Sequence, residues 1–329
     1  MRVAFLGLGL IGGSIARALA ADSTRDEPLG DGAGWELAAW SPDGNGPHAA
    51  LAAGVIGRAA TSIVEAVAGA RLIVLAAPPL ACLDLLDSLA GAGNLPPGAI
   101  VTDVSSTKAT IVARAAALGI PFVGGHPMAG LEKSGFDAAD AGLFVGRPWV
   151  VTVARTSETG SGASTPPPTP RDGVDLVFRL ARACGANPIV MTPDEHDAAV
   201  AGISHLPLIV AAALVEAVAG PAAGVERGDW PTARALSASG WASVTRLARG
   251  DVSMATGIAA TNSRAIAERL RDLETVIAAW RADIEAGNRA RIGARFAAAR
   301  RTLERSDAEA GDGIEYPARA ADHADGPDS

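Results

Sequence analysis

The stretch that decides the fold stands at the start of the chain: Arg2-Val-Ala-Phe-Leu6, followed by Gly7-Leu-Gly9-Leu-Ile-Gly12-Gly-Ser14. The first segment predicts a buried strand, and the Ala/Leu-rich sequence that runs to about Ala21 predicts a helix. In a Gly-x-Gly-x-x-Gly turn between strand and helix, the glycines allow a tight turn, close approach of the backbone to a pyrophosphate, and close helix packing. This unit predicts a dinucleotide site. A glycine-rich corner without a ligand is the alternative.

The rest of the first half alternates between helix-like Ala/Leu segments and apolar strands. We expect the strands at Trp35–Ser41, Leu72–Ala76, Ile100–Val104, Pro121–Gly125, Trp149–Val153 and Pro188–Met191, with a helix at Val174–Cys184 before the last of them. This alternation predicts an α/β fold with a doubly wound parallel sheet and helices on both faces.

The same patterns divide the chain into three predicted segments. Residues 1–192 are expected to form the dinucleotide-binding domain, with a flexible polar insertion at 156–172. Residues 193–304 show only helical periodicity and predict an all-α C-terminal domain. Residues 305–329 are acidic and poor in large apolar groups, which predicts a disordered tail.

Composition excludes several classes of function. The 329 residues carry a formal charge of −8, which gives no general electrostatic case for binding nucleic acid or an anionic membrane. The longest apolar run, Leu206–Val215, is well short of the roughly 20 residues that span a bilayer. Cys82 and Cys184 lack metal-ligand spacing and are expected to be buried thiols. With no secretion signal recognised, we expect a cytoplasmic protein that needs no metal.

The end of the second strand bears on the choice of cofactor. Ser41 stands where an acidic residue would bind the adenosine ribose of NAD. Asp43 follows two residues later, and no arginine is near enough to hold a 2'-phosphate. The residues therefore leave NAD or NADP open, with a slight preference for NAD because Asp43 would repel a nearby dianion.

Two polar motifs follow strands and are expected at the carboxyl edge of the sheet, where doubly wound folds bind ligands. In Gly124–Gly135, His126 is positioned to accept a proton from a substrate hydroxyl while hydride leaves the same carbon. In Thr102–Lys108, Ser106 is expected to bond to His126 and Lys108 to position a loop or phosphate. The alternatives are a histidine that caps a turn and a serine that caps a helix.

These motifs together resemble the prephenate/arogenate dehydrogenase family. The resemblance covers roughly residues 1–300 and is carried by Gly-Leu-Gly-Leu-Ile-Gly-Gly-Ser at 7–14, Asp-Val-Ser-Ser-Thr-Lys at 103–108, Gly-Gly-His-Pro-Met-Ala-Gly at 124–130, Glu-Lys-Ser-Gly at 132–135 and Ile-Ser-His-Leu-Pro at 203–207. It implies a Rossmann-type domain and oxidation of a cyclohexadienyl alcohol at ring C4, with loss of the ring carboxylate as CO2. His126 matches the catalytic histidine, and Ser106 the serine that supports it.

The resemblance also implies the remaining site residues. Substrate contacts are expected from Arg246, which would hold the ring carboxylate, and from Ser204, His205 and Glu132. Cofactor contacts are expected from Gly7, Gly9, Leu10, Ile11, Gly12, Ser41, Ala77, Pro78 and Ser105. Pro207 removes a backbone donor and predicts a kink near His205.

The chain departs from the family pattern at three places. Leu208 replaces a second histidine, Leu131 replaces a common threonine, and the segment after Met254 lacks a tryptophan and an arginine. Prephenate, arogenate and 4-amino-4-deoxyprephenate therefore stay open as substrates. A hydroxyacid dehydrogenase is disfavoured because no lysine follows Lys133, and a non-catalytic dinucleotide-responsive protein is the alternative outside enzymes. We expect a homodimer formed through the apolar helical domain.

Overall fold

The computed structural model describes residues 1–22, 34–91, 94–130, 133–153, 170–220, 225 and 227–311. Contacts divide the chain into one compact unit, Met1–Leu270, and a second that begins at Arg271. The predicted insertion at 156–172 lies outside the described residues except for 170–172, and helix α6 already begins at Arg171. The first unit therefore contains the sheet and most of the helices after Pro193.

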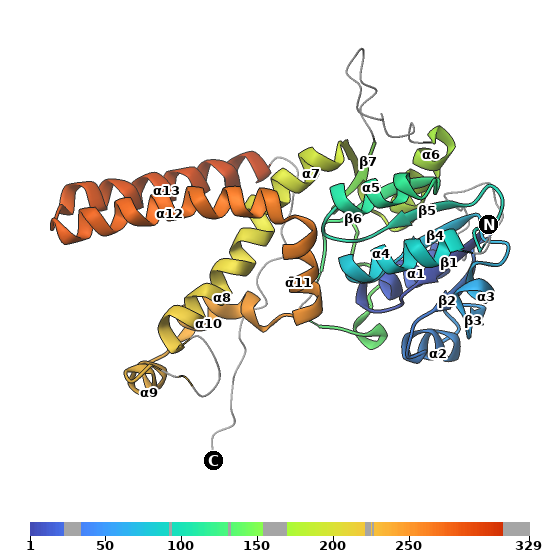
Figure 1. Cartoon of the computed structure of the whole chain (residues 1–329), viewed down its shortest axis with the longest axis horizontal. Coiled ribbons are helices and arrows are strands. Elements are labelled where there is room, and N and C mark those ends of the chain that lie inside the picture. Colours follow the sequence, from blue (N-terminus) through green and yellow to red (C-terminus); the bar gives the residue numbers. More distant parts are fainter. Residues whose placement is uncertain are drawn as a thin grey trace, which may run out of the picture. The chain divides into compact units, whose positions relative to one another are not determined.

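The first unit is built on an eight-stranded sheet in the order β3-β2-β1-β4-β5-β6-β7-β8 (Figure 1). The first six of these positions have the strand order of a dinucleotide-binding α/β fold. The strands are β1 (Arg2–Leu6), β2 (Glu36–Trp40), β3 (Arg58–Ala59), β4 (Leu72–Leu75), β5 (Ile100–Asp103), β6 (Phe122–Pro127), β7 (Pro148–Thr152) and β8 (Asn187–Met191). The doubly wound sheet predicted from the sequence is confirmed.

One strand pairing differs from the prediction of a parallel sheet. β7 runs antiparallel to β6, with His126 opposite Val150, while β8 is parallel to β7. Among the described residues between β6 and β7 there is no α-helical crossover, and the chain turns back through the short 3-10 helix η2 (Phe136–Ala138). A return without a crossover reverses the strand direction.

Helices cover both faces of the sheet, and the alternating residues of β1 show how. Val3 and Phe5 pack into one apolar cluster, whereas Ala4 and Leu6 pack into another. On the first face lie α1 (Leu10–Asp22), α2 (Asn45–Ala52) and α6 (Arg171–Ala183); on the second lie α3 (Ile63–Val67), α4 (Pro79–Ala90) and α5 (Ala109–Ala117). The central strand is therefore buried on both sides, as its apolar sequence predicts.

The described residues after Pro193 form helices joined by turns and short loops, with no strand among them. Its elements in the first unit are α7 (Pro193–Val200), a π-helical turn η3 (Ala201–His205), α8 (Leu206–Ala219), α9 (Trp230–Ala235), α10 (Ser239–Thr245), the 3-10 turn η4 (Arg246–Arg249) and α11 (Val252–Thr261), after which α12 (Ser263–Glu285) begins. The kink predicted at Pro207 takes the form of the π turn, in which Leu206 N donates to Ala201 O. Proline at the second position of α8 lacks the donor that a regular helix needs there.

The π turn joins α7 and α8 into one run, Pro193–Ala219, that is longer than the apolar segment considered in the sequence. Its most apolar 18-residue window has a mean hydropathy of 2.1 and is 22% buried. By length and composition alone the run could cross a membrane. Its N-terminal part, however, contains the buried polar side chains His196, Asp197 and His205.

The second unit consists of the C-terminal part of α12 and α13 (Arg289–Gly311), joined by a short turn at Gly287. Trp280 packs against Phe296 with ring centroids 4.8 Å apart, and the buried carboxylate of Asp283 accepts from Arg295 at 2.6 Å. The tail predicted from residue 305 is corrected in part, because α13 continues to Gly311. Residues 312–329 lie outside the described residues.

Gly7 and Gly9 give a matched test of the turn after β1. Gly7 has φ +94°, and a Cβ there would lie 2.3 Å from Ala76 O, whereas a Cβ at Gly9 would meet nothing within 4 Å. We expect Gly7→Ala to lower the free energy of unfolding by about 1–3 kcal/mol or more. Gly9→Ala should change it by less than about 1 kcal/mol. Thermal denaturation measures both, and equal losses would contradict this account.

Candidate functional site

The turn between β1 and α1 has the shape that a pyrophosphate requires. Gly7 N donates to Trp40 O at 2.8 Å, which fixes the turn against β2, and a Cβ on Gly12 would lie 2.8 Å from Ala76 Cβ. The open space over Gly9 lets a ligand approach the backbone at the start of α1. The turn predicted to hold the dinucleotide therefore fits it, and Leu10 and Ile11 lie in the first turn of that helix.

A cavity of about 330 Å³ extends from this turn to the end of β2. Its lining includes Gly9, Ser41, Asp43 and Asp137. Ser41 Oγ donates to Asp43 Oδ1 at 2.8 Å, and Asn45 donates to both carboxylate oxygens. The Ser41 hydrogen bond is the main cause that lowers the pKa of Asp43 below its ordinary value. The cavity therefore presents an ionised carboxylate where an adenosine ribose would lie.

The residues after β4 lie across the turn from Gly7. Ala77 O accepts from Cys82 Sγ at 3.3 Å and from Ser105 Oγ at 3.4 Å, and Pro78 caps α4. Ser105 is buried, and its hydroxyl is occupied by Ala77 and Cys82. Burial raises the pKa of Cys82 to about 12, so its thiol stays protonated. The Ser105 hydroxyl thus holds two strand ends together.

His126 lies near the end of β6 and is bonded to a histidine from the helical region. His126 Nδ1 and His196 Nε2 are 2.8 Å apart, and His196 Nδ1 lies 2.8 Å from Asp197 Oδ1. Burial and the neighbouring His196, Lys108 and His205 lower the pKa of His126 well below its ordinary value. The imidazole is therefore neutral at pH 7 and able to act as a base.

The predicted bond between Ser106 and His126 is absent among the described residues, and this expectation is wrong. Ser106 is half-buried after β5, and the hydrogen bond at His126 Nδ1 comes from His196 instead. The sequence contained a signal for this partner, because His196 and Asp197 are adjacent polar residues that open an apolar helix. The sequence alone gave no reason to place these two residues beside His126, because no local pattern relates residue 196 to residue 126.

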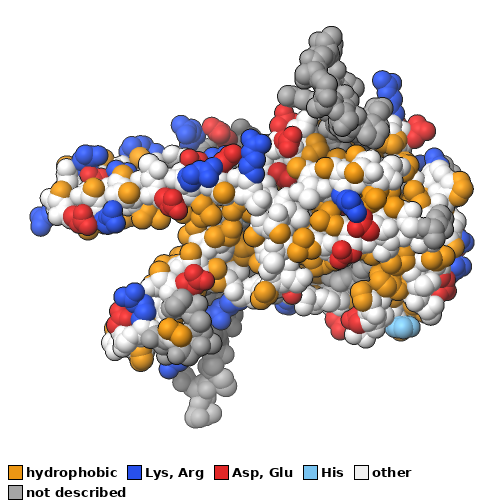
Figure 2. All heavy atoms as spheres, in the orientation of Figure 1, with side chains coloured by type: hydrophobic (Ala, Val, Ile, Leu, Met, Phe, Trp, Pro, Cys, Tyr) orange, Lys and Arg blue, Asp and Glu red, His pale blue; other side chains and the backbone are white. Residues whose placement is uncertain are grey.

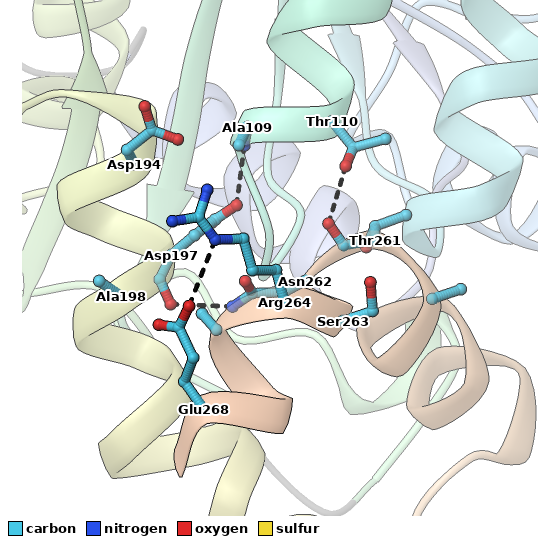
Figure 3. A pocket seen from close by; sticks show the side chains of 12 residues that line it. Ala109, Thr110, Asp194, Asp197, Ala198, Thr261, Asn262, Ser263, Arg264 and Glu268 are labelled. Atoms are coloured by element: carbon cyan, nitrogen blue, oxygen red, sulfur yellow. Dashed lines mark hydrogen bonds and ion pairs between the residues drawn. The ribbon is translucent and has the colours of Figure 1, made fainter.

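Asp197 joins the helical region to the sheet. Its carboxylate accepts from Lys108 N at 2.7 Å and from Ala109 N at 2.8 Å, at the start of α5. Asn262 Nδ2 donates to the backbone carbonyl of Asp197 at 2.8 Å, from the end of α11. Figure 3 shows Asp197 between α5 and α11, beside a cavity of about 480 Å³. Three elements are therefore fixed by one residue.

Lys108 does not reach outward to a phosphate. Its ammonium forms a fully buried ion pair with Asp103, whose carboxylate also accepts from Ser105 N and Gly125 N at 3.1 Å. A buried charge pair of this kind needs additional hydrogen bonds to offset desolvation, and the two backbone donors supply them. Asp103 therefore links the end of β5 to β6 one residue before His126, and Lys108 pairs with its carboxylate.

His205 is fully buried in the π turn. Asn262 Nδ2 lies 3.1 Å from His205 Nδ1, and among the described residues His205 Nε2 has no hydrogen-bond partner of good geometry, although the backbone of Ser106 lies near enough to raise the pKa of the ring. Because the amide nitrogen donates, Nδ1 is the acceptor and Nε2 carries the hydrogen in the neutral ring. Burial, with the nearby His196, lowers the pKa of His205 to about 4. His205 thus presents a buried donor, whereas the neighbouring Ser204 is exposed.

The other predicted substrate residues either lie apart from the buried histidines or fall outside the described residues. Arg246 is exposed at the start of η4, a turn that packs against α8. Its predicted contact with a substrate carboxylate stays a prediction. Leu131 and Glu132 lie outside the described residues. Among the described residues, no group of three or more His, Cys, Asp and Glu side chains is arranged to hold a metal ion.

The strand order and the glycine turn define a dinucleotide-binding α/β protein with an attached helical region. The sequence profile for the nucleotide-binding domain of prephenate dehydrogenase matches residues 36–161, and that for its dimerization domain matches residues 192–297. The chain belongs to the prephenate dehydrogenase family.

Individual relatives agree with this assignment. Prephenate dehydrogenase of Bacillus subtilis is 32% identical over 80% of this chain, and that of Lactococcus lactis is 31% identical over 83%. The chain spans about two thirds of the length of these relatives, 64% and 68%. Arogenate dehydrogenase of Synechocystis is 28% identical with a TM-score of 0.68, over 95% of this chain and all of that one. Prephenate dehydrogenase of A. aeolicus has the same fold, with a TM-score of 0.75 at 23% identity over 93% and 98% of the two chains.

Proposed function

We propose that the protein catalyses the oxidative decarboxylation of prephenate to 4-hydroxyphenylpyruvate with NAD(P), a step of tyrosine synthesis. The observation that carries the proposal is the neutral His126, bonded through Nδ1 to His196 at the same sheet edge as the glycine turn. Family membership supports the substrate class. The departures at Leu131 and Leu208 leave arogenate and 4-amino-4-deoxyprephenate as alternatives, and the resemblance to the Synechocystis enzyme favours testing arogenate first.

In this mechanism His126 accepts the proton of the C4 hydroxyl on Nε2, where no hydrogen bond is found among the described residues. The bound nicotinamide supplies the hydride acceptor. As hydride leaves C4, the ring carboxylate departs as CO2, and its bonding electrons complete the aromatic ring. No further reactant is needed for this balance.

Three other residues are proposed to bind the substrate. Among the described residues, His205 Nε2–H is a buried donor without a well-formed hydrogen bond, which is costly unless a ligand oxygen accepts from it. Arg246 is proposed to hold the ring carboxylate, because a guanidinium can donate two parallel hydrogen bonds to it. Glu132 is proposed to face the substrate side chain on the strength of the family motif.

The direct test combines prephenate and arogenate with NAD and NADP in a two-by-two assay. We expect reduced cofactor and an aromatic product, and His126→Asn should lower kcat by about 100-fold or more. Dinucleotide affinity, measured by calorimetry, should stay within about threefold because His126 is not part of the glycine turn. No turnover with either substrate or with 4-amino-4-deoxyprephenate would contradict the function. Full activity in His126→Asn would favour the binding-protein alternative.

The cavity at the end of β2 supports NAD as the preferred cofactor. Asp43 is ionised and held by Ser41 and Asn45, and Asp137 adds a second carboxylate to the lining. A 2'-phosphate in this cavity would meet both carboxylates and no arginine or lysine of the lining residues. Asp43 therefore acts in place of the acidic residue expected at position 41.

We expect Asp43→Asn to narrow the preference for NAD over NADP by about tenfold, since the substitution removes the charge and keeps an oxygen that accepts from Ser41. The ratio of kcat/KM for the two cofactors measures the change. Lys133→Gln, in an exposed residue outside the cavity lining, is the control and should leave the ratio unchanged. An unaltered ratio in Asp43→Asn would show that the carboxylate does not select the cofactor.

We further propose that a second copy covers the apolar surface of the helical region. Only Ala211 of α8 is buried, although the helix is almost entirely apolar, and Figure 2 shows hydrophobic side chains gathered along it. In the second unit, Val276, Ile277, Ile284, Phe296 and Leu303 are exposed. Apolar surface of this kind on a soluble protein marks an interface. The matched dimerization profile supports a homodimer.

The two free, buried cysteines support a cytoplasmic location.

Sedimentation at micromolar concentration is expected to give a species of about twice the 33.0 kDa chain mass. Ala213→Glu places a charge on the exposed side of α8 and should shift the equilibrium toward monomer. Ala52→Glu is the matched control, because Ala52 is an exposed alanine at the end of α2. A wild-type protein that sediments as a monomer would contradict the proposed dimer.

A further inference from the structure

We propose that His196 and Asp197 are positioning residues that together set the tautomer of His126, and that His196 receives a proton from His126 during the reaction. The inference deepens the proposed function and rests on it for the identity of the proton donor. Both residues are buried in the first half of α7.

The Asp197 carboxylate is held by three hydrogen-bond contacts. Each of its oxygens accepts a backbone N–H, from Lys108 and from Ala109, and Oδ1 also lies 2.8 Å from His196 Nδ1. Backbone N–H groups at a helix start only donate and favour negative charge. Asp197 therefore acts as an acceptor in all three contacts, and His196 Nδ1 must carry a hydrogen.

The hydrogen on His196 Nδ1 determines the direction of the hydrogen bond between His196 and His126. In the neutral ring, one nitrogen donates and the other accepts, so His196 Nε2 is left with a lone pair. His126 Nδ1, 2.8 Å away, must then donate to it. This leaves the lone pair of His126 on Nε2, the nitrogen assigned to the substrate hydroxyl. The opposite tautomer would present a hydrogen to that hydroxyl and could not accept its proton.

The surroundings of His126 and His196 keep both imidazole rings neutral, as these tautomers require. Burial is the largest cause that lowers the pKa of His196, partly opposed by its bond to Asp197. The charged and titratable groups that face His126 are His196 from α7, Lys108 from the start of α5 and His205 from the π turn. A positive charge on His126 is therefore disfavoured by Lys108, and transfer to His196 brings that charge into contact with Asp197.

The proton count balances along this path. The substrate O–H bond breaks and an N–H bond forms on His126 Nε2, while the Nδ1 hydrogen of His126 moves to His196 Nε2. His196 becomes an imidazolium paired with the Asp197 carboxylate, and His126 stays neutral with its hydrogen on Nε2. Hydride leaves to the nicotinamide in the same reaction. The reverse transfers restore the starting tautomers when the proton is released.

The first experiment reads the tautomer without any turnover. The chain has five histidines, so ring nitrogen NMR of the histidine-labelled protein can assign each one through single substitutions. We expect the wild-type His126 to be protonated on Nδ1 and not on Nε2 at pH 7.5. His196→Leu should lose this preference, whereas His196→Gln should keep it, since an amide oxygen can accept from Nδ1. A wild-type His126 protonated on Nε2, or an unchanged tautomer in His196→Leu, overturns the proposal.

The second experiment uses kinetics to distinguish a positioning role of His196 from a contribution to protein stability alone. We expect His196→Leu to lower kcat by about 100-fold or more, with KM for the substrate and Kd for NAD within threefold. His196→Gln should lie between this variant and wild type, because it preserves the tautomer and cannot take the proton. Asp194→Asn, a charge-removing change at an exposed position on the same helix, is the matched control and should leave kcat unchanged.

The outcomes distinguish this inference from the proposed function. A wild-type protein that turns over no cyclohexadienyl substrate overturns the function, while the NMR result still decides the tautomer. Normal turnover in wild type together with an unchanged kcat in His196→Leu overturns the role of His196 and leaves the function intact. If His196→Leu does not fold, as measured by circular dichroism, the wild-type tautomer and His196→Gln still decide the proposal.

Discussion

The arrangement of the site depends on the contact between the Asp197 carboxylate and the two backbone N–H groups at the start of α5. A carboxylate at this point satisfies donors that a helix start leaves without partners. The same carboxylate orients His196, and through it His126 on β6. One buried carboxylate therefore fixes α7 against the start of α5 and orients the pair of histidines beside it.

The buried pair of Asp103 and Lys108 complements this contact from the side of the sheet. Asp103 binds the backbone of Gly125, one residue before His126, so the strand that carries the base is fixed at its end. The two carboxylates, Asp103 and Asp197, both bind the segment that ends at Lys108 and Ala109. This polar layer lies among buried groups, where each unpaired atom would be costly, and the network leaves few of them unpaired.

The sequence predicted the parts of this structure that depend on local signals. Apolar runs located the strands, and the glycine spacing located the turn at Gly7 because its backbone conformation excludes other residues. The antiparallel β7 was missed because an apolar strand carries no mark of its direction. The bond between His126 and His196 was missed because 70 residues separate them, and Ser106 was assigned instead because a motif gives residue types and not distances. The sequence already indicated that Asp43 disfavours a 2'-phosphate, and the structure adds the hydrogen bonds from Ser41 and Asn45 that hold its carboxylate in place.

The π turn at Ala201–His205 determines which residues of one helix meet. His196 and His205 are nine positions apart, a spacing that places side chains on roughly opposite sides of a regular helix of about 3.6 residues per turn. One extra residue in the turn reduces the effective spacing to about eight, or roughly 80°. Both histidines thereby reach the polar layer formed by Asp197 and Asn262. The extra residue of the π turn thus brings both histidines of this otherwise apolar helical run to the buried polar residues beside His126.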